Sequence, residues 1–226
     1  MSKLYIVATP IGNLEDITLR AIRIMKEADF VACEDTRVTR KLTAHYEIET
    51  PLISYHQHSK LQKIDFIISK LKEGKNIALV TDAGTPGISD PGNILVAEAV
   101  KNGIDIITIP GASALAALAS VAGIDMQKFI FLGFPPHKKG RKTFIADIFE
   151  IDFPVIIYES KYRLMKLLKE FSEYSGEKRI QMIIGRELTK MFEEIIRGDV
   201  DNITKYFEDN KEKLKGEFVI IIHKEK

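Results

Sequence analysis

The first half of the chain alternates short apolar runs with amphipathic stretches, and this alternation limits the folds open to it. Five runs have the length of a buried strand: LYIVA, DFVAC, PLISY, NIALVT and IDIITIP. Between them apolar residues recur at helical spacing, as at Ile17, Ala21, Ile24, Met25 and Ala28. Strands that alternate with helices build βαβ units around a parallel sheet. We therefore expect residues 1–111 to form an α/β domain with a parallel sheet.

The pattern changes after residue 111. Five further strand-like runs follow, with only two or three helical stretches among them: KFIFLGF, FPVIIYES, RIQMIIGRELT, FEEIIRG and GEFVIIIH. Two of these runs are separated only by the step KM, which favours a β-hairpin and hence a mixed sheet. The sequence therefore predicts a second α/β domain at residues 112–226, with the alanine-rich stretch GASALAALASVAGI as the connector.

Composition narrows the class of protein. The 226 residues are 45% hydrophobic and 29% charged, with a formal net charge of +1, which is typical of a soluble globular protein. No apolar run is long enough to span a bilayer, and the single cysteine, Cys33, excludes an internal disulfide framework. We expect a cytoplasmic protein whose contacts with nucleic acid, if it makes any, come from a local basic patch.

The loop TDAGTPGISDPG, residues 81–92, follows a predicted strand and is longer than a connection needs. Its glycines let a ligand approach the backbone, and its prolines stiffen it. Asp90 and Pro91 as a helix cap account for the last four residues only. The phosphate-loop and dinucleotide fingerprints are absent. Because ligands bind at the carboxyl ends of parallel strands, we favour a loop for a different adenosine-bearing ligand over a structural turn.

Other polar loops follow the neighbouring strands. In PGASAL, Ser113 either caps a helix or contacts a ligand. In CEDTRVTRKL, Glu34 and Asp35 precede basic residues, as in a capped helix with a solvated face or in an acid–base cluster. The two histidines of SYHQH are too few for a metal site, so no metal is predicted.

Two basic segments lie in the second half. PPHKKGRK carries Lys138, Lys139, Arg141 and Lys142, either as solvated surface or as contacts to RNA phosphates. GRELTKMFEEIIRG brings Arg186, Glu187 and Lys190 to a hairpin, where cross-strand charge pairing is the alternative.

Taken in order, these motifs resemble one family. LYIVATPIGNLEDITLRA, CEDTRVTRKL, SYHQH, VTDAGTPGISDPG, IPGASAL, FLGFPP, IIYES and GRELTKMFEEIIRG are similar to the tetrapyrrole methylase-fold (class III) S-adenosylmethionine-dependent methyltransferases. Within that fold they resemble the branch that 2′-O-methylates the ribose of a decoding-site cytidine in 16S ribosomal RNA. The resemblance runs from Leu4 to about His223.

The resemblance implies a cofactor site and a substrate. S-adenosylmethionine is expected in the cleft between the two domains, the substrate is expected within the 30S subunit, and the enzyme is expected to be a homodimer. The matching positions for the cofactor are Pro10, Gly84, Thr85, Ile88, Ser113, Ala114, Glu159 and Leu188. RNA contacts are expected from Arg37, Arg40, Lys138, Lys139, Arg141 and Arg186.

Methyl transfer to a ribose hydroxyl is an in-line displacement that needs positioning and a general base, but no metal. The candidates for the base are Asp35, His56, Glu187 and Lys190. A carboxylate needs no deprotonation before it accepts a proton, which favours the acidic pair Glu34–Asp35 and Glu187. The alternatives on the same cofactor loops are a methylase of a tetrapyrrole and a non-catalytic S-adenosylmethionine-binding factor of ribosome assembly.

The chain departs from the pattern of this branch in several places. Thr81 replaces a serine, Ala112 replaces a proline of PGPSA, and Lys161–Tyr162 replace the Pro-His of YESPHR. The chain also stops soon after GEFVIIIH, where many relatives carry a helical extension. We therefore expect substrate affinity to be the property that differs most from that of these relatives.

Overall fold

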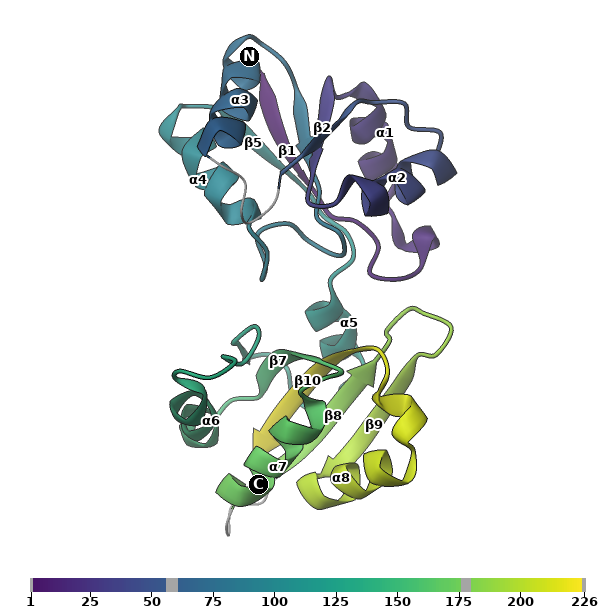
Figure 1. Ribbon diagram of the computed structural model, residues 1–226, viewed down its shortest axis with the longest axis vertical. Coiled ribbons are helices and arrows are strands. Elements are labelled where there is room, and N and C mark those ends of the chain that lie inside the picture. Colours follow the sequence, from purple (N-terminus) through teal and green to yellow (C-terminus); the bar gives the residue numbers. More distant parts are fainter. Residues whose placement is uncertain (1, 56–60, 176–179, 225–226) are drawn as a thin grey trace. The chain divides into compact units, whose positions relative to one another are not determined.

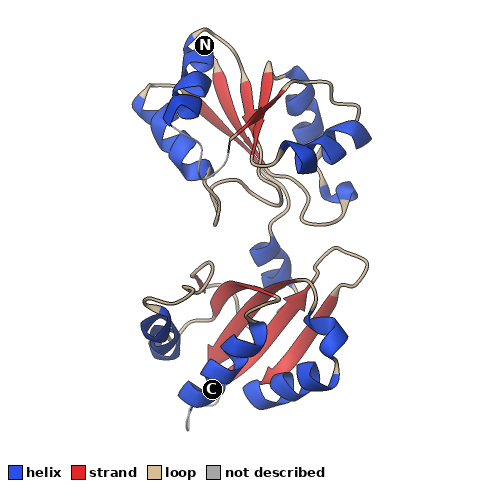
Figure 2. Cartoon of the chain, in the orientation of Figure 1, coloured by secondary structure: helices blue, strands red, loops and turns tan. Residues whose placement is uncertain are grey.

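The computed structural model describes residues 2–55, 61–175 and 180–224, and it divides into two compact units. Unit 1 is Met1–Ser113 and unit 2 is Ala114–Lys226 (Figure 1). The division falls two residues after the boundary expected from the sequence. Each unit combines helices with one five-stranded sheet, so the expected α/β architecture is confirmed (Figure 2).

The sheet of unit 1 is wholly parallel and has the strand order β3-β2-β4-β1-β5. Its strands are β1 (Lys3–Val7), β2 (Phe30–Cys33), β3 (Leu52–Ser54), β4 (Ile77–Leu79) and β5 (Asp105–Ile109). The connecting helices are α1 (Leu19–Glu27), α2 (Thr36–His45), α3 (Leu61–Lys72) and α4 (Gly92–Lys101), with a short 3-10 turn, η1, at Leu14–Asp16.

Side chains on the two faces of this sheet enter different cores, because successive residues of a strand point to opposite faces. Val7 packs with Ala21 of α1 and Leu42 of α2. Leu4 packs with Ile67 of α3 and Leu95 of α4. The apolar runs of the sequence are therefore strands buried on both faces, as expected of a parallel sheet covered by helices.

The sheet of unit 2 is mixed, as predicted, with the order β6-β7-β10-β8-β9. Only β6 and β7 pair in parallel. Its strands are β6 (Ile130–Phe131), β7 (Val155–Ser160), β8 (Ile180–Arg186), β9 (Glu194–Asp199) and β10 (Glu217–Lys224). The helices are α5 (Ala114–Ser120), α6 (Arg141–Glu150), α7 (Leu164–Ser175) and α8 (Val200–Asp209), with a 3-10 turn, η2, at Lys211–Leu214.

The main core of unit 2 lies between one face of this sheet and its long helices. Ile220 of the central strand β10 packs there with Phe171 of α7 and Phe207 of α8. On β8, Gly185 leaves room for Leu118 of α5, since a Cβ at this glycine would lie 2.9 Å from the Leu118 Cδ1. In the part of the chain that is described, no helix is both long and apolar enough to cross a membrane.

Candidate functional site

The loops after β1 and β4 are joined at the carboxyl edge of the unit 1 sheet. Thr9 and Gly84 exchange backbone hydrogen bonds of 2.9 and 3.1 Å, an isolated antiparallel bridge in an otherwise parallel sheet. The Thr9 Oγ1, which is buried, also donates to the Thr81 carbonyl at 3.0 Å. The long loop of residues 81–92 is thus held against the first loop by its backbone.

The loop after β5 joins the same structure. The Thr85 Oγ1 donates to the Ala112 carbonyl at 3.2 Å. A Cβ at Gly111 would lie 3.0 Å from the Cβ of Ala8, closer than an ordinary contact, so glycine favours this approach of the two backbones. Gly84 has a φ of +85°, a left-handed conformation that favours glycine.

Asp90 closes the end of the long loop. Its carboxylate accepts from the Gly87 N–H at 2.8 and 2.9 Å and from the Gly92 N–H at 2.7 Å. Helix α4 begins at Gly92, so Pro91 precedes the helix by one residue instead of being its first residue. The carboxylate of Asp90 also fixes the turn at Gly87, whose φ is +88°. The Asp90 carboxylate therefore closes the loop and binds the first N–H of α4 at the same time.

The loop after β2 completes the structure. The hydroxyl of Thr81 donates to the Glu34 carboxylate, and the Asp35 N–H donates to the Asp82 Oδ1 at 3.1 Å. We call residues 8–11, 34–37, 81–90 and 110–113 the loop rim. Because adjacent strands supply these loops and hydrogen bonds connect them, the rim is a continuous surface at the carboxyl edge.

Five of the eight predicted cofactor residues lie on the loop rim: Pro10, Gly84, Thr85, Ile88 and Ser113. Pro10 and Gly84 are buried, whereas Ile88 is 40% exposed on an otherwise polar loop. The other three, Ala114, Glu159 and Leu188, belong to unit 2. Unit 1 by itself therefore gathers the loop residues that the sequence singled out.

The rim contains a polar hollow beside β2, β3 and β4. It is lined by Glu34, Asp35, Thr36, Arg37, Ser54 and Asp82. Burial raises the pKa of Glu34, and the negative charges of Asp82 and Asp90 add to this effect, while the hydrogen bond from Thr81 opposes it. Glu34 is thus the carboxyl group of the hollow whose proton affinity is increased.

Asp35 has the opposite character. Its carboxylate caps α2 by accepting from the Arg37 N–H at 2.8 Å, and it pairs with the Arg37 Nη2 at 2.6 Å. The bonds from Arg37 lower the pKa of Asp35 to about 2. Asp35 is therefore a weak proton acceptor at neutral pH, and the cap of a solvated helix describes it better than a base does. Arg37 and Arg40 are exposed on α2.

The other two described candidates for the base lie in the loop between β8 and β9. Glu187, at φ +49°, accepts from the Lys190 Nζ at 3.0 Å and from the Glu217 N–H at 2.9 Å. Burial alone would raise the pKa of Glu187, but these bonds outweigh it and the pKa is lowered. Burial would lower the pKa of Lys190, but its bonds to Glu217 and Glu187 raise it. The pair is a salt bridge, with Lys190 protonated.

Two of the predicted RNA contacts, Arg141 and Arg186, are buried, and their guanidinium groups bond inside unit 2. Arg186 is 8% exposed and donates to the carbonyls of Lys213 at 2.7 Å and Phe192 at 2.8 Å. Arg141 is 3% exposed and pairs with the Glu170 carboxylate at 2.8 Å. In the sequence Arg141 belongs to the basic run PPHKKGRK, whereas Arg186 was expected at a hairpin with cross-strand charge pairing as the alternative.

Glu159, a predicted cofactor contact, is an ion-pair partner inside unit 2. Its buried carboxylate lies 2.8 Å from the Arg163 Nε and 3.6 Å from the Arg141 Nη2. It also accepts from the Ser160 N–H at 2.7 Å. We call Arg141, Glu159, Arg163 and Glu170 the arginine clamp. The clamp was not predicted, because its members lie in separate segments of the chain.

The remaining predicted residues are placed as follows. Leu188 is buried against Gly185, and Lys138 and Lys139 are exposed. His56 lies outside the described residues, as does His58. Within the described ranges, no group of three or more His, Cys, Asp or Glu side chains is arranged to hold a metal ion.

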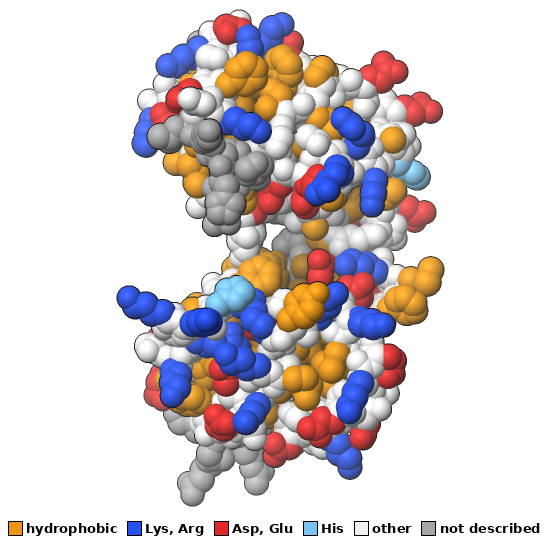
Figure 3. All heavy atoms as spheres, in the orientation of Figure 1, with side chains coloured by type: hydrophobic (Ala, Val, Ile, Leu, Met, Phe, Trp, Pro, Cys, Tyr) orange, Lys and Arg blue, Asp and Glu red, His pale blue; other side chains and the backbone are white. Residues whose placement is uncertain are grey.

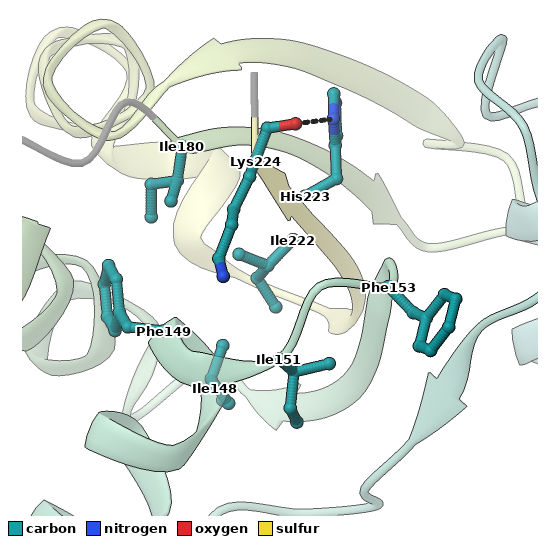
Figure 4. A pocket seen from close by; sticks show the side chains of 8 residues that line it. All are labelled: Ile148, Phe149, Ile151, Phe153, Ile180, Ile222, His223 and Lys224. Carbon is teal, nitrogen blue, oxygen red and sulfur yellow. Dashed lines mark hydrogen bonds between the residues drawn. The ribbon is translucent and has the colours of Figure 1, made fainter. Parts of the chain in front are cut away.

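A second cavity, in unit 2, is too small for a cofactor. Figure 4 shows the side chains that surround it: Ile148, Phe149, Ile151, Phe153, Ile180, Ile222, His223 and Lys224. Its volume of about 10 Å³ suits one water molecule. The Lys224 Nζ bonds to the Asp152 Oδ1 at 2.7 Å, and His223 faces its neighbour's carbonyl. The chemistry of the molecule is therefore better sought at the loop rim.

Comparison with known proteins gives a consistent picture. The family model described as Tetrapyrrole (Corrin/Porphyrin) Methylases matches residues 3–204. A relative from Halalkalibacterium halodurans, named ribosomal RNA small subunit methyltransferase I, is 45% identical over 97% of this chain and 75% of its own length. A relative of the same name from Thermotoga maritima is 41% identical over 98% of both chains.

Solved structures share the fold at lower identity. A cobalt precorrin-4 methyltransferase superposes with a TM-score of 0.71 at 21% identity, covering 97% of this chain and 94% of that one. A diphthine synthase superposes with a TM-score of 0.74 at 14% identity, covering 98% of this chain and 90% of that one. At these identities the likeness concerns the fold alone.

Proposed function

The chain belongs to the tetrapyrrole (corrin/porphyrin) methylase family and is a small-subunit ribosomal RNA methyltransferase; we propose that it methylates the ribose 2′-hydroxyl of a decoding-site cytidine in 16S RNA. The methyl donor in this proposal is S-adenosylmethionine. The observation that carries it is the identity of 41% to 45% to relatives of one name over almost the whole chain. The tetrapyrrole alternative has support from the description of the family model and from solved structures that share the fold at low identity, such as 21%.

The loop rim fits an adenosine-bearing cofactor better than a polyphosphate. It has no phosphate-loop lysine, and it offers an exposed apolar side chain, Ile88, next to the glycine backbone of Gly87. Residues on the rim that would hold the cofactor are Pro10, Gly84, Thr85, Ile88 and Ser113. When bound, S-adenosylmethionine would supply a methyl group activated by a sulfonium, with a neutral thioether as the leaving group.

Within this proposal Glu34 accepts the proton of the ribose hydroxyl. Its carboxyl group lies in the hollow of the rim and has a raised pKa, whereas Asp35 is held ionised by Arg37. A base is most effective when its pKa lies near the working pH. Glu34 would take up the proton of the 2′-hydroxyl, and bound S-adenosylmethionine would supply the methyl group that replaces it. His56 remains an alternative base.

The rest of the site holds RNA in this proposal. Arg37 lines the hollow, Arg40 is exposed on the same helix α2, and Lys138 and Lys139 lie on the surface of unit 2. Phosphate contacts from such side chains give affinity without sequence preference. The substrate would be the 30S subunit. Because this particle is in the cytoplasm, the proposed site of action is the cytoplasm.

We also propose a homodimer. The support from this chain is a set of large apolar side chains that water reaches, among them Leu19 at 87%, Met191 at 90% and Phe192 at 64% exposure. Light scattering would then give twice the chain mass of 25.6 kDa.

The test is methyl transfer from labelled S-adenosylmethionine to 30S subunits that lack decoding-site methylation, with the modified nucleotide identified by mass spectrometry. Label on one cytidine ribose is expected; absence of label on the particle with cofactor binding intact would overturn the proposal.

Glu34→Gln should lower kcat by about 10²- to 10⁴-fold. Asp35→Asn should change kcat less than about tenfold, because its carboxylate caps a helix. Equal losses in the two variants would remove Glu34 as the base.

A further inference from the structure

Unit 2 carries a surface on which lysines and aromatic rings alternate. Two segments form it: the loop at residues 134–142, which runs into the first turn of α6, and the turn at residues 160–163, which starts at the last residue of β7. Its exposed members are Phe134, His137, Lys138, Lys139, Lys142, Lys161 and Tyr162. We call this set the basic–aromatic surface. Figure 3 shows Lys and Arg side chains gathered over the part of unit 2 that carries this loop and α6.

The arginine clamp fastens these two segments together. The Arg163 Nη1 donates to the Pro135 carbonyl at 3.1 Å, and the Arg141 Nη1 donates to the Pro136 carbonyl at 3.1 Å. Both arginines pair with the buried Glu159. The carbonyls of two consecutive loop residues thus accept hydrogen bonds from guanidinium groups, and the positive charge of these groups is balanced by the carboxylates of Glu159 and Glu170. The loop is therefore held in one position relative to the turn.

The clamp also separates buried charge from exposed charge. Arg141 and Arg163 are neutralised by Glu159 and Glu170, while neither segment contains an aspartate or glutamate. The four lysines at the surface therefore have no carboxylate partner within their own segments. Such a positive, fixed surface suits a polyanion.

Tyr162 is the unusual member of the set. It is 84% exposed, and the Lys161 Nζ lies 5.0 Å from the centroid of its ring. A tyrosine ring this open to water contributes little to folding, because burial of the ring is what would stabilise the protein. A flat ring beside an ammonium group offers one contact to a base and one to the adjoining phosphate.

We propose that the basic–aromatic surface binds single-stranded RNA, with an unpaired base stacked on Tyr162 and phosphates held by Lys138, Lys139, Lys142 and Lys161. This inference rests on the proposed function and adds where unit 2 grips its substrate. A single strand is favoured over a duplex because a base must be unstacked to lie on a side-chain ring. Arg141 and Arg163 act as positioning residues that keep the lysines and the ring on one surface.

The experiment measures binding of the full chain to a fluorescent, unstructured RNA of about 10 nucleotides, a length within the usual site size. Tyr162→Ala should weaken binding about 5- to 100-fold without changing its salt dependence. Tyr162→Phe should keep affinity within about twofold, since the ring remains. Lys161→Ala should reduce the slope of log K against log salt by about 0.7.

A matched control exists in unit 1. Phe66 is 45% exposed with the Lys70 Nζ 5.6 Å from its ring, a similar pair without an arginine clamp. Phe66→Ala should leave RNA binding unchanged. A duplex of the same length should bind more weakly than the single strand.

The outcomes separate this inference from the function on which it rests. If wild type methylates 30S subunits but Tyr162→Ala binds RNA like wild type, or the duplex binds equally well, the stacking surface is wrong and the function stands. If Tyr162→Ala and Phe66→Ala weaken binding equally, the surface is also wrong. If the wild type transfers no methyl group to 30S subunits yet Tyr162→Ala still loses RNA affinity, the function fails and the surface stands.

Discussion

Two neighbouring carboxyl groups on the loop rim, Glu34 and Asp35, respond to their surroundings in opposite ways. Glu34 is half-buried next to Asp82 and Asp90, which raises its pKa above the ordinary 4.5. Asp35 accepts hydrogen bonds from Arg37, which lower its pKa from 3.8 to about 2. The unfolded chain removes both influences, so each group links folding to pH with its own sign.

Glu34→Gln is expected to stabilise the fold at neutral pH. Between pH 4.5 and the raised pKa of Glu34, the folded state binds more protons than the unfolded state, so the free energy of unfolding falls as pH rises. The variant escapes this loss, and its advantage over wild type should vanish near pH 4. Urea unfolding from pH 4 to 8 measures the difference.

Asp35→Asn is expected to change the stability in the opposite direction over the same pH series. Asp35 contributes stability above pH 3.8 that is lost as pH falls towards 2, so this variant should be less stable than wild type at neutral pH. An unchanged gap between wild type and Glu34→Gln from pH 4 to 8 would contradict the raised pKa of Glu34.

At this scale the sequence located residues better than it assigned their roles. Asp35 was correctly seen as a possible helix cap, because an acid followed by a helical stretch is a local pattern. The burial of Arg141 and Arg186 was not predictable, because it depends on carboxylates and carbonyls far away in sequence, such as Glu170 and the Lys213 carbonyl. Only the three-dimensional neighbours distinguish these arginines from exposed lysines nearby.

Among the elements, β7, α6 and α7 are joined by charge as well as by packing. The arginine clamp links Glu159 of β7 to Arg141 of α6, and Arg141 to Glu170 of α7. Burying such charges is costly, but once they are buried the loss of one partner leaves another uncompensated. The clamp is therefore a point where a small change has a large effect on stability.

Glu159→Gln is expected to lower the free energy of unfolding by about 3 kcal/mol or more, since the buried Arg141 and the partly buried Arg163 lose their shared carboxylate. Glu73→Gln is the control, because it removes a Lys70–Glu73 pair whose glutamate is 52% exposed. Its effect should stay below about 1 kcal/mol. Urea unfolding of both variants with an unchanged m-value checks this; equal effects would show that the clamp contributes no more than a surface pair.

The sequence predicted the elements of unit 1 well and their arrangement poorly. Each of its five strand-like runs contains a strand, because an apolar run between helical stripes is a local signal. The order β3-β2-β4-β1-β5 and the Thr9–Gly84 bridge were not predicted, because pairing depends on contacts between distant segments. In unit 2 the hairpin step KM was visible, but the central position of β10 was not.

At the scale of the whole molecule, each of the two units has hydrophobic core of its own. The clusters of buried side chains each draw on one unit: two belong to residues 1–113 and one to residues 114–226. A unit with its own core can unfold without the other.

Residues 114–226, expressed alone, are therefore expected to fold. Circular dichroism should show native helix and strand content and a single cooperative urea transition. Introducing Phe207→Ala, which removes a fully buried ring, should cost this fragment about 3–5 kcal/mol and serves as the control for a real core. A fragment without a cooperative transition would show that unit 2 depends on unit 1.

The position of β10 sets the order in which the two units are completed during synthesis. Residues 217–224 lie between β7 and β8, so the other strands of unit 2 leave the ribosome with their central neighbour missing. Unit 1 is made entirely of earlier residues and faces no such wait. At about 5–20 residues per second, several seconds separate the release of the two units. From the synthesis of β8 until that of β10, β7 and β8 expose unpaired edges, and the nascent chain is then most dependent on chaperones.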